Sequence, residues 1–478
     1  ILFGNYYWGL LVMLSKKLLS DIRNGTKMTL KQQFQLVFFL SIPAVMAQVT
    51  SVVMQYIDAS MVGSLGAEAS ASIGLVSSST WLFGGVCGAV SSGFSIQAAQ
   101  SIGGGRIKDA RSIMRQAVIA AFISSIVLAA AGAITSINLP AWLGGALEIQ
   151  KDARYYFLIY VLSLPAVQAS RLAGGLLQCS GNMKVPGILN TLMCILDVIF
   201  NFILIFPSRE VKAAGIILNV PGAGLGVAGA ALGTALSQLV IAVLMMYFLC
   251  FKSDIFKIKQ GESWKLKKDC ILRAVKLALP IGWENLMMCG AMVVSTRIVA
   301  PLGSVPIAAN SFAVTAESLC YMPGYGIAEA AATLSGQSIG AGRKELARRF
   351  ARLSVWSGIA SMSVTGAAMF FAAPFMMSLL TPDLAIQALG VSILRIEAFA
   401  EPMYGASIVA SGAFRGAGDT LVPSMMNFGS IWFVRITLAL LLVGNLALKG
   451  VWIAMCIELC FRGMIFMVRL YSGRWMKK

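Results

Sequence analysis

The sequence predicts an all-α membrane protein with twelve transmembrane helices arranged as two related six-helix bundles. Three observations support this: the composition is 58% hydrophobic and only 12% charged, long apolar stretches recur along the chain, and its two halves repeat each other. Soluble proteins carry about 25% charged residues. A chain with a mean hydropathy of +0.79 therefore has too little polar surface for water and needs lipid around it.

Apolar stretches of the length that a bilayer core requires, about 20 residues in a helix, recur twelve times. We expect spans near residues 34–62, 70–98, 113–137, 155–179, 186–207, 225–251, 274–301, 306–338, 351–378, 386–413, 421–445 and 448–469. The apolar start of the chain is too short to span, so residues 1–30 are expected to form a peripheral segment. Residues 471–478 form a short basic tail.

The basic residues predict the orientation of these spans. With the N-terminus inside, 29 of the 38 Lys and Arg residues fall in inner segments, Arg171 and Arg415 among them, and five fall in outer segments. Such a bias indicates that the basic segments, and both termini, are cytoplasmic. No aromatic-and-basic module accompanies the net charge of +18, so we expect no binding of nucleic acid.

The chain repeats itself at an offset of 237 residues. This offset carries Pro43 onto Pro280, Gln100–Gly103 onto Gln337–Gly340, Gly105 onto Gly342, Gly181 onto Gly418 and Pro186 onto Pro423. Each half holds six spans, an even number, so the halves should be related by a pseudo-twofold axis along the membrane normal. We expect bundles at residues 31–250 and 274–470, joined by a basic cytoplasmic linker at residues 251–273.

Three stretches resemble the multidrug and toxic compound extrusion (MATE) family. They are Asp58-Ala-Ser-Met-Val-Gly63-Ser-Leu-Gly66, Gly336-Gln-Ser-Ile-Gly-Ala-Gly342 and Arg415-Gly-Ala-Gly-Asp419-Thr420-Leu-Val-Pro423. The resemblance extends over about residues 30–470. It implies a V-shaped transporter in a bacterial plasma (inner) membrane, which exports organic, cationic and amphipathic compounds in exchange for protons or sodium ions.

Carboxylates within the spans are the candidate ion-coupling residues, because the chain has no histidine and charge inside a membrane needs a partner, a proton or a cavity. Asp58 occupies the position of the coupling aspartate in the family motif. Asp197 and Asn201 are four residues apart and share a helix face, and a carboxylate beside an amide suits a shared proton or a sodium ion. Glu284, four residues after Pro280, and Glu401 are further candidates, and Arg395 is expected to neutralise one of the neighbouring acids.

Four residues at four-residue steps in the eighth span, Glu317, Tyr321, Tyr325 and Glu329, form the candidate substrate surface. Asn190 extends the polar stripe of the fifth span towards the same role. Acids and aromatic rings together suit a cationic aromatic compound. The alternative is plain helix packing against the small residues of the second span.

Two other functions remain open at this stage: a flippase for lipid-linked intermediates from the same superfamily, and a membrane scaffold or receptor that transports nothing. We expect no enzyme, because no nucleophile–base pair is apparent, and no cofactor beyond H⁺ or Na⁺ as coupling ion. A metal is expected only as Na⁺ at Asp58, Asp197 and Asn201. The expected partners are a small-molecule substrate and the lipid bilayer, around a monomer.

Overall fold

The computed structural model describes residues 14–213 and 216–476, and these residues are almost entirely helical. The first half contains α2 (Leu30–Gly63), α3 (Ala67–Gly103), α4 (Ile107–Thr135), α5 (Leu139–Trp142), α6 (Leu147–Leu162), α7 (Leu164–Cys179), α8 (Lys184–Ile205), α9 (Gly226–Tyr247) and the π-helical turn η1 (Phe248–Lys252). The second half contains α10 (Lys268–Val299), η2 (Ala300–Leu302), α11 (Ser304–Gly340), α12 (Lys344–Leu380), α13 (Leu384–Glu397), α14 (Glu401–Ala417), α15 (Leu421–Gly429), η3 (Ser430–Arg435), α16 (Ile436–Ser472) and η4 (Arg474–Met476).

These helices make twelve spans. By length and composition, eight described helices can cross a membrane, and the bent pair α6–α7 is a ninth. The 52-residue stretch from Leu421 to Ser472 holds two spans, because Ala447 leaves the helical region (φ 48°, ψ −133°) and Gly450 then lies against the carbonyl of Leu442. The remaining two spans are α11, a 37-residue helix that is less apolar because it contains Glu317 and Glu329, and the broken pair α13–α14.

Equivalent prolines break the fourth span of each half. Pro165 lies in the first turn of α7 and Pro402 in the first turn of α14, and the two are 237 residues apart in the sequence. Proline has no N–H to donate to the preceding turn, so the helix must restart there. The α6–α7 pair bends by 46° at this break.

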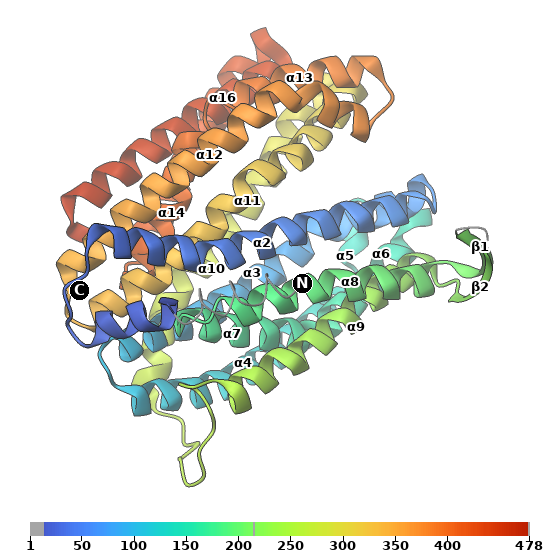
Figure 1. Cartoon of the computed structure of the whole chain (residues 1–478). Coiled ribbons are helices and arrows are strands. Elements are labelled where there is room, and N and C mark those ends of the chain that lie inside the picture. Colours follow the sequence, from blue (N-terminus) through green and yellow to red (C-terminus); the bar gives the residue numbers. More distant parts are fainter. Residues whose placement is uncertain (1–13, 214–215, 477–478) are drawn as a thin grey trace.

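The two halves form two six-helix bundles of the same design, so the predicted fold class is confirmed. Figure 1 shows the bundles in contact at one end and diverging towards the other, as two arms of a V. Glycines at repeat-equivalent turns have matching backbones: φ is +73° at Gly105 and Gly342, and +91° at Gly181 and Gly418. Only glycine adopts such values without strain.

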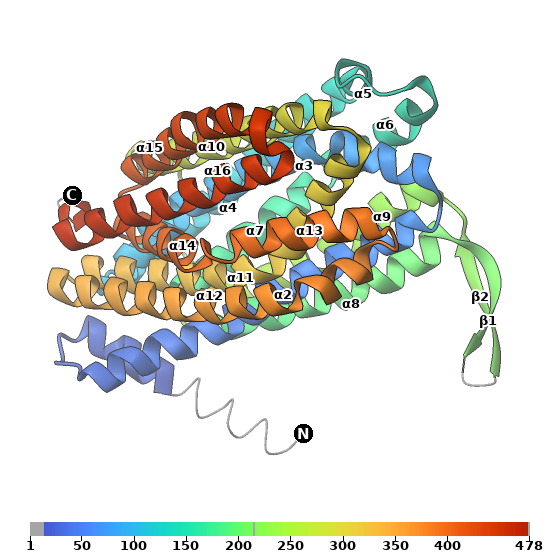
Figure 2. The same ribbon diagram turned by 90° about the horizontal axis from the view of Figure 1, so that it is seen from above.

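We call the end where the bundles meet the basic end, since the segments 104–106, 253–267 and 341–343 lie there. The other end carries a feature that the sequence did not predict. Strands β1 (Pro207–Ala213) and β2 (Ile216–Ala223) pair as an antiparallel hairpin between α8 and α9, and Figure 2 shows it projecting beyond the helices. We call this the hairpin end.

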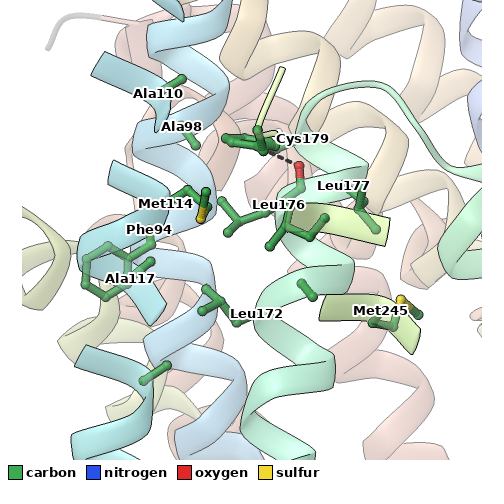
Figure 3. Packing of buried hydrophobic residues seen from close by; sticks show 14 of the residues in the cluster. Phe94, Ala98, Ala110, Met114, Ala117, Leu172, Leu176, Leu177, Cys179 and Met245 are labelled. Carbon is green, nitrogen blue, oxygen red and sulfur yellow. Dashed lines mark hydrogen bonds between the residues drawn. The ribbon is translucent and has the colours of Figure 1, made fainter. Parts of the chain in front are cut away.

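The core of the first bundle lies between α3, α4, α7 and α9. Figure 3 shows Phe94, Met114, Leu172, Leu176 and Met245 packed against one another, and each is at most 3% exposed. Aliphatic burial of this kind holds the α7 backbone in a fixed position. It thereby fixes the polar residues that α7 presents to the space between the bundles.

Residues 14–28 close the basic end. Residues 14–23 are helical, and Leu19 and Ile22 are buried in a cluster that contains Met183 of the first bundle and Phe350 of the second. The Arg343 guanidinium donates to the carbonyls of Asp21, Ile22 and Thr26, at 3.0, 3.4 and 2.8 Å. The segment expected to be peripheral is thus packed against both bundles over its described part, while residues 1–13 lie outside the described residues.

Candidate transport cavity and ion sites

A polar cavity of about 640 Å³ lies between the two bundles. Gln48, Arg171 and Asn190 line it from the first bundle, and Tyr325, Glu329 and Tyr404 line it from the second. The cavity is large enough for a drug-sized molecule. Among the substrate residues expected from sequence, Asn190, Tyr325 and Glu329 meet here.

Glu329 joins the two bundles across this cavity. Its Oε1 accepts a hydrogen bond from Gln48 Nε2 at 2.9 Å, and its Oε2 accepts from Gln178 Nε2 at 2.7 Å. Both amides belong to the first bundle. Thr333 and Gln337, one and two turns further along α11, donate to the carbonyls of Gln178 and Cys179. The line of contact between α11 and α7 therefore runs from the cavity to the basic end.

Glu317 and Tyr321 lie elsewhere than the cavity wall. Glu317 is 6% exposed within the second bundle. The Tyr321 ring packs between those of Tyr325 and Tyr404, with centroids at 6.0 and 5.6 Å. The expected stripe on the eighth span is thus divided: its half towards the basic end faces the cavity, and its other half faces the bundle interior. Rotation of about 40° per four residues explains the division.

Arg171 is a cavity residue that lies within a transmembrane helix and not in a segment between helices. It was counted in an inner segment, but it lies within α7, and its exposed guanidinium contributes to the cavity wall. The count was wrong because the predicted span 155–179 already contains Arg171, as α7 does. The orientation bias survives the loss of one residue. A Lys or Arg inside a span is itself a signal of a functional site, and that signal was available.

A pair of carboxylates lies in the first bundle, about one turn from the cavity wall. Asn201 Nδ2 donates both to Asp58 Oδ1 at 2.9 Å and to Asp197 Oδ2 at 3.0 Å. Ser237 of α9 donates to Asp197 Oδ1 at 3.2 Å. The helices α2, α8 and α9 thus bring Asp58, Asp197 and Asn201 together, whereas the sequence predicted only that Asp197 and Asn201 share a face.

Close approach of α9 makes this cluster compact. A side chain at Gly233 would overlap Oδ1 of the Asn201 side-chain amide, and that oxygen has no hydrogen-bond partner among the described residues. Asp197 and Asn201 are at most 1% exposed, while Asp58 is partly exposed. Two carboxylates held by one amide repel each other, so the cluster favours a shared proton or a bound monovalent cation.

Glu284 has a different environment, in which three donors surround it. Arg415 Nη2 donates to Oε1 at 2.8 Å, Asn427 Nδ2 donates to Oε1 at 2.7 Å, and Ser424 donates to Oε2 at 2.7 Å. The Glu284 side chain is almost fully buried, and that of Arg415 is 32% exposed. The arrangement is that of a carboxylate held as an anion, which links α10 to α14 and α15 beside the cavity.

Glu397 and Glu401 are two buried acids that have no hydrogen-bond partner among the described residues, on either oxygen. Both are 0% exposed. Arg395 does not neutralise either one: its Nε donates to the Phe370 carbonyl at 3.3 Å, and its guanidinium lies over the Phe370 ring. That expectation was wrong because Arg395 faces outwards on α13 while Glu397 faces inwards. Burial without a donor favours a neutral carboxyl group or a bound cation.

Glu458, in contrast, is fully paired. Arg462 Nε lies 2.9 Å from Oε1, Arg435 Nε lies 3.4 Å from Oε2, and Ser430 donates to Oε1. These contacts join the last two spans of the second bundle. The second bundle thus holds buried acids that are paired, such as Glu284 and Glu458, and buried acids without a hydrogen bond or ion pair among the described residues, which are Glu317, Glu397 and Glu401. No group of three or more His, Cys, Asp or Glu residues in the described part of the chain is arranged to hold a metal ion.

Two helical bundles arranged as the arms of a V, a cavity between them and buried carboxylates in both bundles together define a polytopic membrane transporter. Known proteins show which one. The MatE family profile matches residues 43–203 and again residues 280–441, which reproduces the internal repeat. The chain therefore belongs to the MatE family, that of the MATE transporters.

Curated relatives cover nearly the whole chain. A probable multidrug resistance protein NorM of Thermotoga maritima is 25% identical over 447 residues, 92% of each chain. Another of the same name from Bacillus anthracis is 24% identical over 451 residues, 92% of this chain and 95% of its own.

Solved structures have the same fold. A MOP superfamily transporter from Pyrococcus furiosus superposes with a TM-score of 0.85 at 19% identity, over 93% of this chain and 97% of its own. A MATE transporter from Vibrio cholerae gives 0.85 at 14% identity, over 94% and 99%. A MATE family transporter in an outward-facing conformation gives 0.84 at 19% identity, over 92% and 97%.

Proposed function

We propose that this protein is a secondary active antiporter that exports organic, amphipathic compounds, cationic ones included, in exchange for protons or sodium ions. The observation that carries the proposal is the carboxylate pair Asp58–Asp197, held by the single amide of Asn201. A site that gains and loses one positive charge at membrane depth is what ion coupling requires. The multidrug resistance names of the relatives support the export of organic compounds.

The position of the pair supports coupling to the cavity. Met54, Met193 and Gln238 line the cavity, and they lie four residues before Asp58, four before Asp197 and next to Ser237. A change of charge at the pair therefore acts on helices that form the cavity wall. An ion and a substrate that favour different arrangements of α2, α8 and α9 would exchange for each other, because each shifts the equilibrium by its own differential affinity.

We further propose that the basic end faces the cytoplasm of a bacterial inner membrane, with both termini inside and no obligatory protein partner. The distribution of Lys and Arg supports this orientation. The cavity would then open towards the outside in the conformation described here, since the bundles diverge towards the hairpin end (Figure 1). The unpartnered acids Glu397 and Glu401 are candidates for a second ion site in the other bundle.

The test is efflux of a fluorescent organic cation in everted membrane vesicles under an imposed proton or sodium gradient. Wild type is compared with Asp58→Asn and Asp197→Asn, and with Glu148→Gln on α6 as a control acid outside the cluster and the cavity. Gradient-driven transport that both cluster variants lose, while the control keeps it, supports the proposal, and the effective gradient identifies the ion. Transport that is unchanged in both cluster variants would refute coupling at this pair.

A further inference from the structure

The charged side chains on the cavity wall are all paired or hydrogen-bonded, with one exception. Glu329 accepts from two amides, Glu284 and Arg415 pair with each other, and Arg462 pairs with Glu458. Arg171 has no hydrogen bond and no carboxylate within 4.0 Å among the described residues. The unsatisfied charge of the cavity is therefore positive, and it belongs to the first bundle.

Two glycines of α3 lie beside this guanidinium. A side chain at Gly84 would come within 3.7 Å of Arg171 Nη2, and one at Gly88 within 3.5 Å of Nη1. The neighbouring Tyr160 hydroxyl donates to the Thr80 carbonyl at 2.9 Å and makes no hydrogen bond with Arg171. The guanidinium of Arg171 thus lies on the cavity wall without a hydrogen-bond acceptor among the described residues.

An arginine at membrane depth is costly unless it has an anionic partner. Where one is absent from the protein, the ligand of the cavity can supply it. A guanidinium matches a planar carboxylate with two parallel hydrogen bonds, which makes it selective for such groups over neutral ones.

We propose that Arg171 is a substrate-binding residue and that it recognises a carboxylate on the exported compound. The substrate class is then an amphipathic organic acid or zwitterion, whose aromatic or basic part lies against Tyr325, Tyr404 and Glu329 on the opposite wall. This inference rests on the proposed function as an exporter, since it names what the same cavity selects. It extends the expectation of cationic substrates, which came from Glu329 and the tyrosines alone.

Glu329 is the alternative partner for Arg171, because it is the other charged residue of the cavity wall that has no ion pair. Its two oxygens are already held by Gln48 and Gln178, and no contact within 4.0 Å joins it to Arg171. If Arg171 served only to attract Glu329 at long range, its loss would change the binding of every substrate to the same extent. Recognition of a carboxylate, in contrast, distinguishes an acid from its ester, and this difference makes the two explanations separable.

The experiment measures binding and transport of a matched pair of probes: a xanthene dye with a free carboxylate, and its methyl ester. Binding is followed by fluorescence polarisation with the purified full chain in detergent, which needs no ion gradient. Transport is followed in proteoliposomes under an imposed gradient. The variants are Arg171→Gln and Arg171→Lys, with Arg154→Gln as a control, since Arg154 is an exposed arginine of α6 that lies outside the cavity wall.

We expect wild type and Arg154→Gln to bind the acid more tightly than the ester. Arg171→Gln should weaken binding of the acid by about tenfold or more, as loss of a hydrogen-bonded charge does, and change binding of the ester less than about twofold. Arg171→Lys should restore part of the preference. The inference would be overturned if Arg171→Gln weakened binding of both probes equally, or if wild type bound the acid no more tightly than the ester.

The binding readout separates this inference from the proposed function. An acid preference that depends on Arg171 supports the inference even if no imposed gradient drives transport, a result that would count against antiport instead. Gradient-driven transport in which acid and ester behave alike supports antiport and refutes the role of Arg171. Chloride or phosphate that displaces the acid probe as well as acetate does would indicate a general anion site, and would overturn selectivity for a carboxylate.

Discussion

Gly103 and Gly340, equivalent residues of the internal repeat, lie backbone against backbone where the two bundles meet. A side chain at Gly103 would overlap the backbone of Gln337, and one at Gly340 would overlap that of Gln100. The two contacts are related by the same offset of 237 residues as the sequence repeat. The pseudo-twofold axis therefore passes between these glycines, and the closed basic end depends on their having no Cβ atom.

Gly103→Ala should separate the bundles at the basic end, because backbone cannot yield to a methyl group as a flexible side chain can. Overpacking of this kind costs about 1–3 kcal/mol. Double electron–electron resonance between spin labels on α4 and α12 should report a longer distance. Gly74→Ala on the same helix has nothing within 4 Å of the new Cβ, so it should leave the distance unchanged. A normal distance in Gly103→Ala would show that the contact is not what holds this end closed.

Arg415→Ala should destabilise the second bundle, because it leaves the Glu284 carboxylate buried without its ionic partner. Breaking a buried pair from one side costs about 3–5 kcal/mol, while Ser424 and Asn427 still donate to Glu284. The double variant Glu284→Gln, Arg415→Ala should recover part of this loss, since the buried charge is gone. Thermal unfolding of the purified protein in detergent compares Arg415→Ala, Glu284→Gln and the double variant with wild type. Additive losses in the double variant would contradict a direct pairing.

Much of this architecture could be predicted from the sequence, because the signals were strong and local. The length of the apolar stretches predicted the spans, and the internal repeat predicted two bundles of the same orientation. Helix periodicity placed Asp197 and Asn201 on one face, where the structure places them. The broken fourth spans were also readable, since Pro165 and Pro402 obey the repeat offset, although the signal was not used.

The rest depended on contacts between distant segments, which no periodicity encodes. Ser237 reaches Asp197 only because Gly233 lets α9 approach α8. Glu284 was expected to bind an ion, but its three donors come from α14 and α15, far along the chain. Arg415 was assigned to a loop because its predicted span ended at residue 413, whereas α14 continues to Ala417. Arg171 was counted as a loop residue although its predicted span, 155–179, contains it. The hairpin β1–β2 follows from pairing between two short segments that carry no clear alternation.

Arg343 should anchor the N-terminal helix to the second bundle. Its guanidinium satisfies carbonyls at the C-terminal end of residues 14–23, where cations are also favoured by the helix dipole. Arg343→Ala should lower the protection of residues 14–28 against hydrogen exchange by about 1–3 kcal/mol. Arg106, its repeat equivalent, is exposed and pairs only loosely with Asp109, at 4.0 Å. Arg106→Ala should leave that protection unchanged, and equal exchange in both variants would argue against an anchor.

Glu262 should make the linker between the bundles sensitive to acid. Its partial burial opposes the charge, but hydrogen bonds and charge from Arg111 and Arg115 outweigh this and hold the pKa of Glu262 below its ordinary value of 4.5. A depressed pKa in the folded state means that the stabilisation is present above the unfolded pKa and is lost as pH falls through the folded one. The docking of residues 253–267 on α4 should accordingly hold at neutral pH and loosen below about pH 4.

Limited proteolysis of the linker across that pH range measures this loosening, with a protease active in acid. Glu262→Gln should be cleaved faster already at neutral pH, and acid should add little to its rate. Asp254→Asn removes the exposed pair with Lys16 in the same linker, and surface pairs contribute little to stability. That control should therefore keep the acid transition of the wild type. A transition that persists in Glu262→Gln would assign the acid sensitivity to another group.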